Sequence, residues 1–286
     1  MTNAYHNIPF CTHVDRLIDL ALDEDIGSGD ITTEALKMRG LSGRADIVAK
    51  EPVVIAGLDL VRLVYQKIDR SISFYPCASD GDRIEPDTCV AELAGEMQPL
   101  LAGERTALNF LQRLSGIATN VRAYADSMPG SNVRLTDTRK TTPGWRVLEK
   151  YAVRIGGGFN HRMGLYDGVL IKENHIAACK GIGPAVAMAR RNVSHLVKIE
   201  VETEDLGQVR QALEAGADVI MLDNMGLDEI AEAVNIIGGR AAVEVSGRVD
   251  RGQLERLCAA GVNIISSGAL THAAGSVDLS MYIVPT

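Results

Sequence analysis

Polar residues that could perform chemistry follow a series of short apolar segments in the second half of the sequence. Six such segments end in charged, amide or hydroxyl side chains: Asp137-Thr138-Arg139, Lys172-Glu173-Asn174-His175, Glu200-Val201-Glu202, Asp223-Asn224, Glu244-Val245-Ser246 and Ser266-Ser267-Gly268. Polar residues at the carboxyl ends of successive parallel strands build the active sites of α/β barrels. The pattern therefore predicts one site at a shared edge of a parallel sheet.

Two features of this predicted edge suit a phosphate-bearing substrate. Glu202 and Asp223 are carboxylates on neighbouring predicted strands, and carboxylates hold Mg²⁺ through water while substrate phosphates complete its coordination. Salt bridges to nearby Lys or Arg explain the same two residues without a metal. The Ser-Gly turns at Ser246-Gly247 and Ser267-Gly268 suit phosphate, which barrel enzymes bind on their last loops through backbone N–H groups. Ser-Gly also occurs in many other turns, so this signal is weak when taken alone.

The net charge of −8 hides a basic segment. Residues 134–175 carry eight Lys and Arg against four Asp and Glu. A focused basic segment in an acidic protein indicates an anion site. Five of its cations and histidines lie at predicted turns and strand ends, where they can clamp carboxylates: Arg139, Lys140, His161, Arg162 and Lys172.

A solvated basic face on the predicted helix Trp145–Ile155 explains the remaining cations of the segment, Arg146, Lys150 and Arg154. It does not explain the cations at the turns. Carboxylate clamps, acidic strand ends and phosphate turns together predict a substrate that is anionic at both ends.

The elements that must position these residues change in pattern near residue 117. Before it, helical periodicity at Cys11–Leu22, Leu58–Lys67 and Leu101–Leu114 mixes with strands at Ala45–Ile55, Ser71–Pro76 and Cys89–Leu93. After it, apolar strands alternate with helices, which is typical of parallel pairing. The predicted strands are Val133–Asp137, Val169–Lys172, Val197–Val201, Val219–Asp223, Val243–Ser246 and Asn263–Ser267. Six strand–helix units leave an incomplete barrel and a doubly wound sheet both open.

Composition excludes several classes of protein. The 286 residues are 46% hydrophobic and 23% charged, as in ordinary globular proteins. No apolar run is long enough for a membrane span, and we expect no signal peptide. The negative net charge and 4% aromatic content argue against nucleic-acid binding. The five cysteines are odd in number and far apart, which indicates neither a disulfide framework nor a zinc site. A reducing, cytoplasmic location is expected.

The segment DTRKTTPGWRVLEKYAVRIGGGFNHRMGLYDGVLIKENHI, Asp137–Ile176, closely resembles the quinolinate phosphoribosyltransferase family, also called carboxylating nicotinate-nucleotide pyrophosphorylases. Further segments resemble the family in the same order, and the likeness covers nearly the whole chain: Ala21–Thr33, Ala102–Thr119, Ile199–Glu202, Ile220–Asn224, Glu244–Gly247 and Ser266–His272. The resemblance implies an N-terminal α/β sandwich domain at 1–116, to which a C-terminal tail at 273–286 returns. An open, incomplete α/β barrel of about six parallel strands would occupy 117–272.

The activity implied by the resemblance is that of a glycosyltransferase of the pentosyltransferase class in NAD biosynthesis. It takes quinolinate and 5-phosphoribosyl-1-pyrophosphate to nicotinate mononucleotide, pyrophosphate and CO₂, with Mg²⁺. The resemblance also implies a homodimer with a shared active site, and some family members assemble further.

The matched motifs imply residue roles as well. Thr138, Arg139, Lys140, His161, Arg162 and Lys172 would surround quinolinate, and Arg105 would reach in from the partner chain. Glu202 and Asp223 would lie by the ribose hydroxyls and the metal, and they join Lys140 and Lys172 as the implied catalytic residues. The 5′-phosphate would be held by Ser246, Gly247, Arg248, Ser267, Gly268 and Ala269.

Three alternatives remain open at the level of sequence. A molybdenum-transport-associated paralogue shares the TRKT and HR motifs, but the motif LIKENH with Lys172 favours the quinolinate enzyme. A lyase using Lys172 or Lys198 as a Schiff base is a second. A non-catalytic anion-binding protein is the third.

Overall fold

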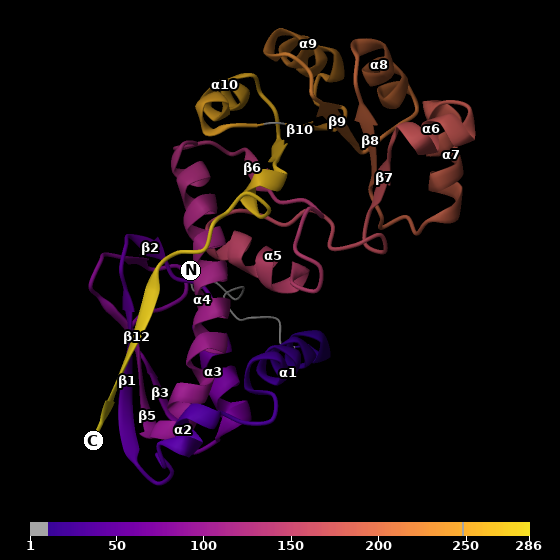
Figure 1. Ribbon diagram of the computed structural model, residues 1–286. Coiled ribbons are helices and arrows are strands. Elements are labelled where there is room, and N and C mark those ends of the chain that lie inside the picture. The colour runs from indigo at the N-terminus through magenta and orange to yellow at the C-terminus, as the bar shows by residue number, and fades with distance from the viewer. Residues whose placement is uncertain (1–10, 248) are drawn as a thin grey trace. The chain divides into compact units, whose positions relative to one another are not determined.

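A computed structural model describes residues 11–247 and 249–286 and separates them into two compact units (Figure 1). The first unit contains the chain up to Arg122 together with 142–157 and 270–286, and the second contains 123–141 and 158–269. The division predicted from sequence, 1–116 with 273–286 and 117–272, differs mainly at 142–157. That segment packs within the first unit although it lies between two strands of the second.

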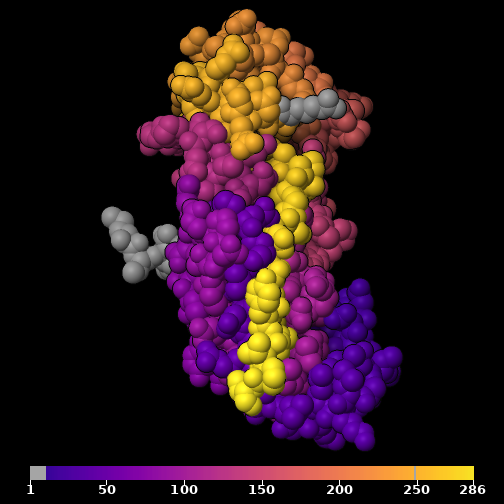
Figure 2. All heavy atoms as spheres, turned by 60° about the vertical axis from the view of Figure 1, so that its left-hand side comes forward, coloured from indigo at the N-terminus to yellow at the C-terminus, as the bar shows by residue number. Residues whose placement is uncertain are grey.

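The first unit contains a four-stranded antiparallel sheet in the order β12-β1-β5-β3. Its strands are β1 (Ser42–Ala49), β3 (Ser73–Pro76), β5 (Cys89–Glu96) and β12 (Leu279–Pro285), and a separate pair is formed by β2 (Val53–Val54) and β4 (Arg83–Ile84). Alternate residues of β1 are buried, so one face of the sheet meets the core. Met281 of β12 lies opposite Ile47 of β1. The end of the chain therefore completes this sheet, and Figure 2 shows it running along the surface of the first unit.

Five helices belong largely to the first unit: α1 (Thr12–Ile26), α2 (Ile31–Ala35), α3 (Leu58–Ile68), α4 (Met97–Asp126) and α5 (Arg146–Ile155). Tyr65 of α3 donates a hydrogen bond to the carbonyl of Leu100 on α4 at 3.0 Å. The strand predicted at Ala45–Ile55 is wrong as a single element, because β1 and β2 are separate. Pro52 lies between them and lacks the N–H that a continuous ladder needs.

Helix α5 is more deeply buried than the sequence predicted for this part of the basic segment. A solvated basic face was predicted for it, but Lys150 is only 1% exposed and every residue from Leu148 to Val153 is buried. Glu149 is also fully buried and binds Arg113 at 2.9 Å. The prediction fails for Lys150 because α5 packs inside the first unit, with Trp145 stacked on Phe110 of α4 at 4.8 Å between ring centroids.

The second unit is built on a six-stranded sheet in the order β6-β11-β10-β9-β8-β7, and all neighbouring strands are parallel. Its strands are β6 (Arg134–Thr136), β7 (Val169–Ile171), β8 (Ile199–Thr203), β9 (Val219–Asp223), β10 (Ala242–Ser246) and β11 (Ile264–Ser266). The order begins with β6 and ends with β7, so the sheet is open. The predicted fold class, a mixed α/β protein with six parallel strands, is confirmed.

The connections of this sheet carry helices on its outer side (Figure 1). They are α6 (Glu173–Cys179), α7 (Ile182–Asn192), α8 (Leu206–Glu214), α9 (Leu227–Ile237), α10 (Leu254–Ala259) and the short 3₁₀ turns η1 (Arg251–Gln253) and η2 (Gly268–Leu270). Helix α6 was not predicted. Lys172 is its N-cap residue, and the N–H of Lys172 donates to Nδ1 of His175 at 3.0 Å.

In the part of the chain that the structure describes, none of the helices combines the length and apolar character needed to cross a bilayer.

A substitution at Gly116 of α4 would test how closely the C-terminal tail packs within the first unit. A Cβ atom at this position would lie 2.0 Å from the carbonyl oxygen of Gly275, which is backbone and cannot rotate away. We expect Gly116→Ala to lower the free energy of unfolding by about 1–3 kcal/mol, measured by urea denaturation. Gly183→Ala in α7 is the matched control, since its Cβ meets open space. The control should be neutral or stabilising by up to about 1 kcal/mol. Equal effects of both variants would contradict close packing at Gly116.

Candidate active site

The carboxyl ends of the parallel strands bring the sequence-predicted polar residues to one edge. In the register of the sheet, Asp223 pairs with Ser246, Ser246 with Ser266, and Ser266 with Thr136. These four residues stand side by side at the ends of β9, β10, β11 and β6. Lys172 follows β7 directly, and its ammonium group forms an ion pair with Glu202 on β8. The structure therefore gathers the ends of all six strands as predicted from the sequence.

Glu202 and Asp223 are two acidic side chains of this edge, and both are half-buried. The ion pair of Glu202 with Lys172 engages Oε2. Asp223 Oδ2 accepts a hydrogen bond from Nδ2 of Asn224 at 2.8 Å. Each contact engages one carboxylate oxygen. The pair fits the oxygen ligands that a hydrated Mg²⁺ takes in proteins.

The two Ser-Gly turns lie at the ends of β10 and β11. Gly247 has a φ of +133°, and a Cβ atom there would lie 2.6 Å from Oδ1 of Asn224. A side chain is therefore excluded at this turn. At the second turn Ser267 Oγ accepts a hydrogen bond from the N–H of Ala269 at 3.3 Å, and Gly268 begins η2. Arg248, predicted beside the first turn, lies outside the described residues.

A buried carboxylate holds the loop that carries His161 and Arg162. Asp137, at the end of β6, has no exposed surface. Its oxygens accept hydrogen bonds from Nδ2 of Asn160 at 2.7 Å and from the N–H of His161 at 2.9 Å. Arg162 is further fixed by donating from Nη1 to the carbonyl of Gly168 at 3.0 Å. The loop is thus oriented in large part by a carboxylate that has no contact with solvent.

The guanidinium groups of Arg139 and Arg162 repel each other. Burial and the positive charge of Arg139 lower the pKa of Arg162, while Glu200 and Asp167 oppose the shift. An anionic ligand between the guanidinium groups would relieve their repulsion. Arg139 and Lys140 are exposed, and the N–H of Lys140 donates to Oγ1 of Thr138 at 3.0 Å. The segment therefore gathers positive charge from Arg139, Lys140 and Arg162.

His161 points into the interior of the sheet. Its Nε2 lies 3.1 Å from Oε2 of Glu200 and 3.5 Å from Oε1 of Glu244, and both glutamates are buried. A cavity of about 400 Å³ adjoins these three residues and extends to Val169 and Val219, which begin β7 and β9. The cavity thus reaches the amino ends of these strands, and it is also lined by Thr136 and Arg162.

The protonation of this buried group follows from its neighbours. Burial alone would lower the pKa of His161, but hydrogen bonds with Glu200 and Glu244 outweigh burial and raise it. Burial raises the pKa of Glu200; His161 opposes this shift, and the charge of Glu244 adds to it. In the neutral ring, Nδ1 of His161 accepts the N–H of Arg162 at 2.8 Å and Nε2 carries the proton that faces the glutamates.

The predicted clamp residues are therefore in different settings. Arg139, Lys140 and Arg162 contribute positive charge to neighbouring loop segments. Lys172 forms an ion pair with Glu202. His161 instead contacts the buried Glu200 and Glu244. Arg105 lies in the first unit, exposed on α4.

The sequence placed Asp137, Glu200 and Glu244 among the polar strand ends but did not predict their supporting role. A signal existed for two of them, because Glu200 and Glu244 stand two positions before Glu202 and Ser246. In a strand, residues i and i+2 face the same side.

Comparison with known proteins agrees with this architecture. The family profile described as "Quinolinate phosphoribosyl transferase, N-terminal domain" matches residues 30–115, and the corresponding C-terminal domain profile matches 117–282. The chain is 45% identical over 266 residues to a probable nicotinate-nucleotide pyrophosphorylase [carboxylating] of Bacillus subtilis, covering 93% of this chain and 92% of that protein. It is 37% identical to quinolinate phosphoribosyltransferase [decarboxylating] 1b of Nicotiana tabacum, covering 93% and 81% of the two chains.

A solved structure gives the same result. The nicotinate-nucleotide pyrophosphorylase of Francisella tularensis superimposes with a TM-score of 0.93 at 39% identity, covering 99% of this chain and 100% of that one.

The two buried glutamates predict a measurable property of His161. We expect Glu244→Gln to lower the pKa of the His161 imidazole, because it removes one of the two carboxylates that stabilise the protonated ring. The pKa can be followed by ¹⁵N–¹H NMR titration, with His161→Gln used to assign the signal. Glu232→Gln is the control, since Glu232 is an exposed carboxylate on α9. An identical His161 titration in Glu244→Gln and the control would rule out this coupling.

Proposed function

The chain belongs to the quinolinate phosphoribosyltransferase family, and from this we propose that it transfers a phosphoribosyl group to quinolinate with loss of CO₂. The substrates are quinolinate and 5-phosphoribosyl-1-pyrophosphate, and the products are nicotinate mononucleotide, pyrophosphate and CO₂. The observation that carries this proposal is the match of both family domains over residues 30–282, which includes the polar strand ends.

The residues 138–140 and 160–162, which we call the basic loop, are suited to the dicarboxylate. Arg139 and Arg162 offer planar forks that bind carboxylates bidentately. Their mutual repulsion in the free protein makes a dianion a stabilising ligand. Asp137 fixes Asn160 and His161 by two hydrogen bonds, so the adjoining Arg162 is positioned before the substrate arrives. We assign quinolinate to this loop, with Thr138, Lys140, His161 and Lys172 as its other neighbours.

The acidic strand ends are suited to the sugar. Loss of pyrophosphate from the anomeric carbon builds positive charge on the ribose, and carboxylates at Glu202 and Asp223 would stabilise that charge. The same two residues would hold Mg²⁺, through water, and the metal when bound would offset the charge of the pyrophosphate leaving group. Lys140 adds positive charge for the same purpose. The turns at Ser246-Gly247, with Arg248, and Ser267-Gly268-Ala269 would bind the 5′-phosphate.

Decarboxylation then needs little further from the protein. Once its nitrogen is ribosylated, the pyridine ring is cationic and can stabilise the carbanion that forms at C2 when CO₂ leaves. A proton then takes the place of the lost carboxylate at C2. Orientation of the substrate is therefore the main contribution of the basic loop.

Three further features belong to this proposal. We propose a homodimer in which Arg105 of one chain completes the site of the other, with further assembly open. We propose a cytoplasmic location, in keeping with the five free cysteines. We assign neither nucleic acid nor membrane as a partner.

The reaction is tested by release of CO₂ from carboxyl-labelled quinolinate. We expect release that requires both 5-phosphoribosyl-1-pyrophosphate and Mg²⁺, with nicotinate mononucleotide formed in equal amount. Asp223→Asn should reduce the rate on the order of 100-fold, because a charge at the reacting sugar is lost. No release from folded wild-type protein would reject the proposal and favour the molybdenum-associated alternative, which molybdate binding would then test.

The shared site is tested by mixing variants. Arg162→Ala should weaken quinolinate binding more than 5-phosphoribosyl-1-pyrophosphate binding, and Arg105→Ala should also be nearly inactive. Random exchange of the two variants makes about half of the dimers mixed, and each mixed dimer has one intact site out of two. Activity should therefore return to about a quarter of the wild-type value. Exchanged heterodimers without any recovery would show that Arg105 acts within its own chain.

A further inference from the structure

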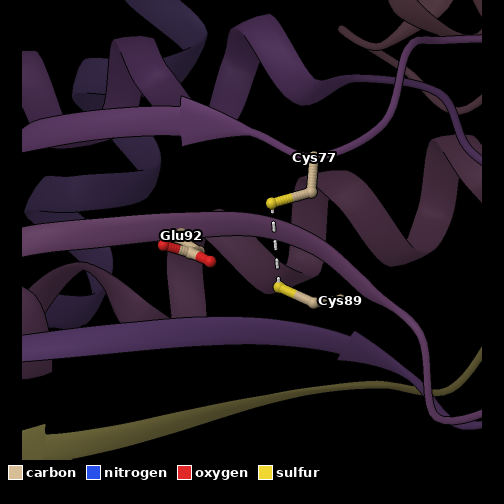
Figure 3. A group of neighbouring side chains, drawn as sticks. All are labelled: Cys77, Cys89 and Glu92. Carbon is tan, nitrogen blue, oxygen red and sulfur yellow. Dashed lines mark hydrogen bonds between the residues drawn. The ribbon is translucent and has the colours of Figure 1, made fainter.

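Two cysteines far apart in the sequence meet on the antiparallel sheet of the first unit. The residue after β3, Cys77, donates its N–H to the carbonyl of Val90 on β5 at 3.0 Å. This extends the β3–β5 pairing by one step and places Cys77 beside Cys89. The two Sγ atoms lie 4.0 Å apart. Figure 3 shows the sulfur atoms facing each other, with Glu92 of β5 beside them.

A third ligand atom completes the group. The two sulfurs and a carboxylate oxygen of Glu92 all lie within 4.8 Å of one another. Glu92 forms an exposed salt bridge with Arg44 at 2.9 Å through Oε2. Exposed ion pairs of this kind contribute about 0–1 kcal/mol, so a cation could displace Arg44 at little cost.

The surroundings of the group are negative. Asp46 of β1 lies opposite Glu92 in the register of the sheet. A cation bound at this group would offset the charges of Glu92 and Asp46.

The spacing of the sulfurs is compatible with a shared metal ion. Two thiolates on a tetrahedral Zn²⁺, each about 2.3 Å from the ion, stand about 3.8 Å apart. A disulfide needs about 2.05 Å. The 4.0 Å separation is therefore within a few tenths of an ångström of a shared metal ligand geometry.

We propose that Cys77, Cys89 and Glu92 form a binding site for a thiophilic divalent cation such as Zn²⁺, with water as the fourth ligand. The site is independent of the active site, because its residues lie on the antiparallel sheet of the first unit and none of them has a proposed role in the transfer reaction. Cys77 is exposed and the other two ligands are half-buried, so the ion can enter from solvent.

The test uses Co²⁺ as a spectroscopic probe on the reduced, full-length chain under anaerobic conditions. Excess Mg²⁺ in the buffer occupies oxygen-only sites. We expect one Co²⁺ per chain with a thiolate-to-cobalt charge-transfer band, and stoichiometric Zn²⁺ should remove the band. Cys77→Ser and Cys89→Ser should each weaken binding by on the order of 100-fold or more, and Glu92→Gln by about tenfold.

Cys258→Ser is the matched control, since Cys258 is a half-buried free thiol in the second unit. It should bind Co²⁺ like the wild type. Circular dichroism melting of each variant separates loss of binding from loss of folding. Absence of the charge-transfer band in wild type, or its persistence in the folded double variant of Cys77 and Cys89, would overturn the proposal.

Discussion

The second unit depends on how its interior accommodates two buried carboxylates. Glu200 and Glu244 face the inside of the parallel sheet with almost no exposure. Buried charges are costly unless a partner neutralises them, and His161 is the partner within reach of both. His161 comes from a loop rather than from a strand, so the loop itself must be held. Asp137 holds it from the end of β6. Through His161 and Asp137, the buried glutamates of the sheet and the loop that carries His161 therefore form one connected network.

This network also explains why the site has two layers. Residues two positions apart in a strand face the same side, so Glu202 and Ser246 stand above Glu200 and Glu244 on β8 and β10. The lower layer is buried and faces His161 of the loop. The upper layer is more exposed and carries the groups proposed to meet the sugar. Positioning and chemistry are therefore performed by different residues of the same strands.

Much of this arrangement was predictable from the sequence. Near-continuous apolar runs predicted all six parallel strands, because strands buried on both faces leave this simple pattern. Their polar ends predicted the edge that carries Glu202, Asp223 and Ser246. Helix α6 was missed because its seven residues are too few to show periodicity. Helix α4 was predicted to end near Leu114 but continues to Asp126, since Gly116 serves close packing rather than helix termination.

What the sequence could not predict depends on register and on tertiary packing. Lysine side chains usually lie at the surface, yet the packing of α5 within the first unit buries Lys150. Glu200 and His161 are far apart in the sequence, and only the pairing of strands and the course of a loop bring them together. The same holds for Cys77 and Cys89. Side chains become ligands of one site when neighbouring strands place them side by side, and spacing along a single strand does not reveal it.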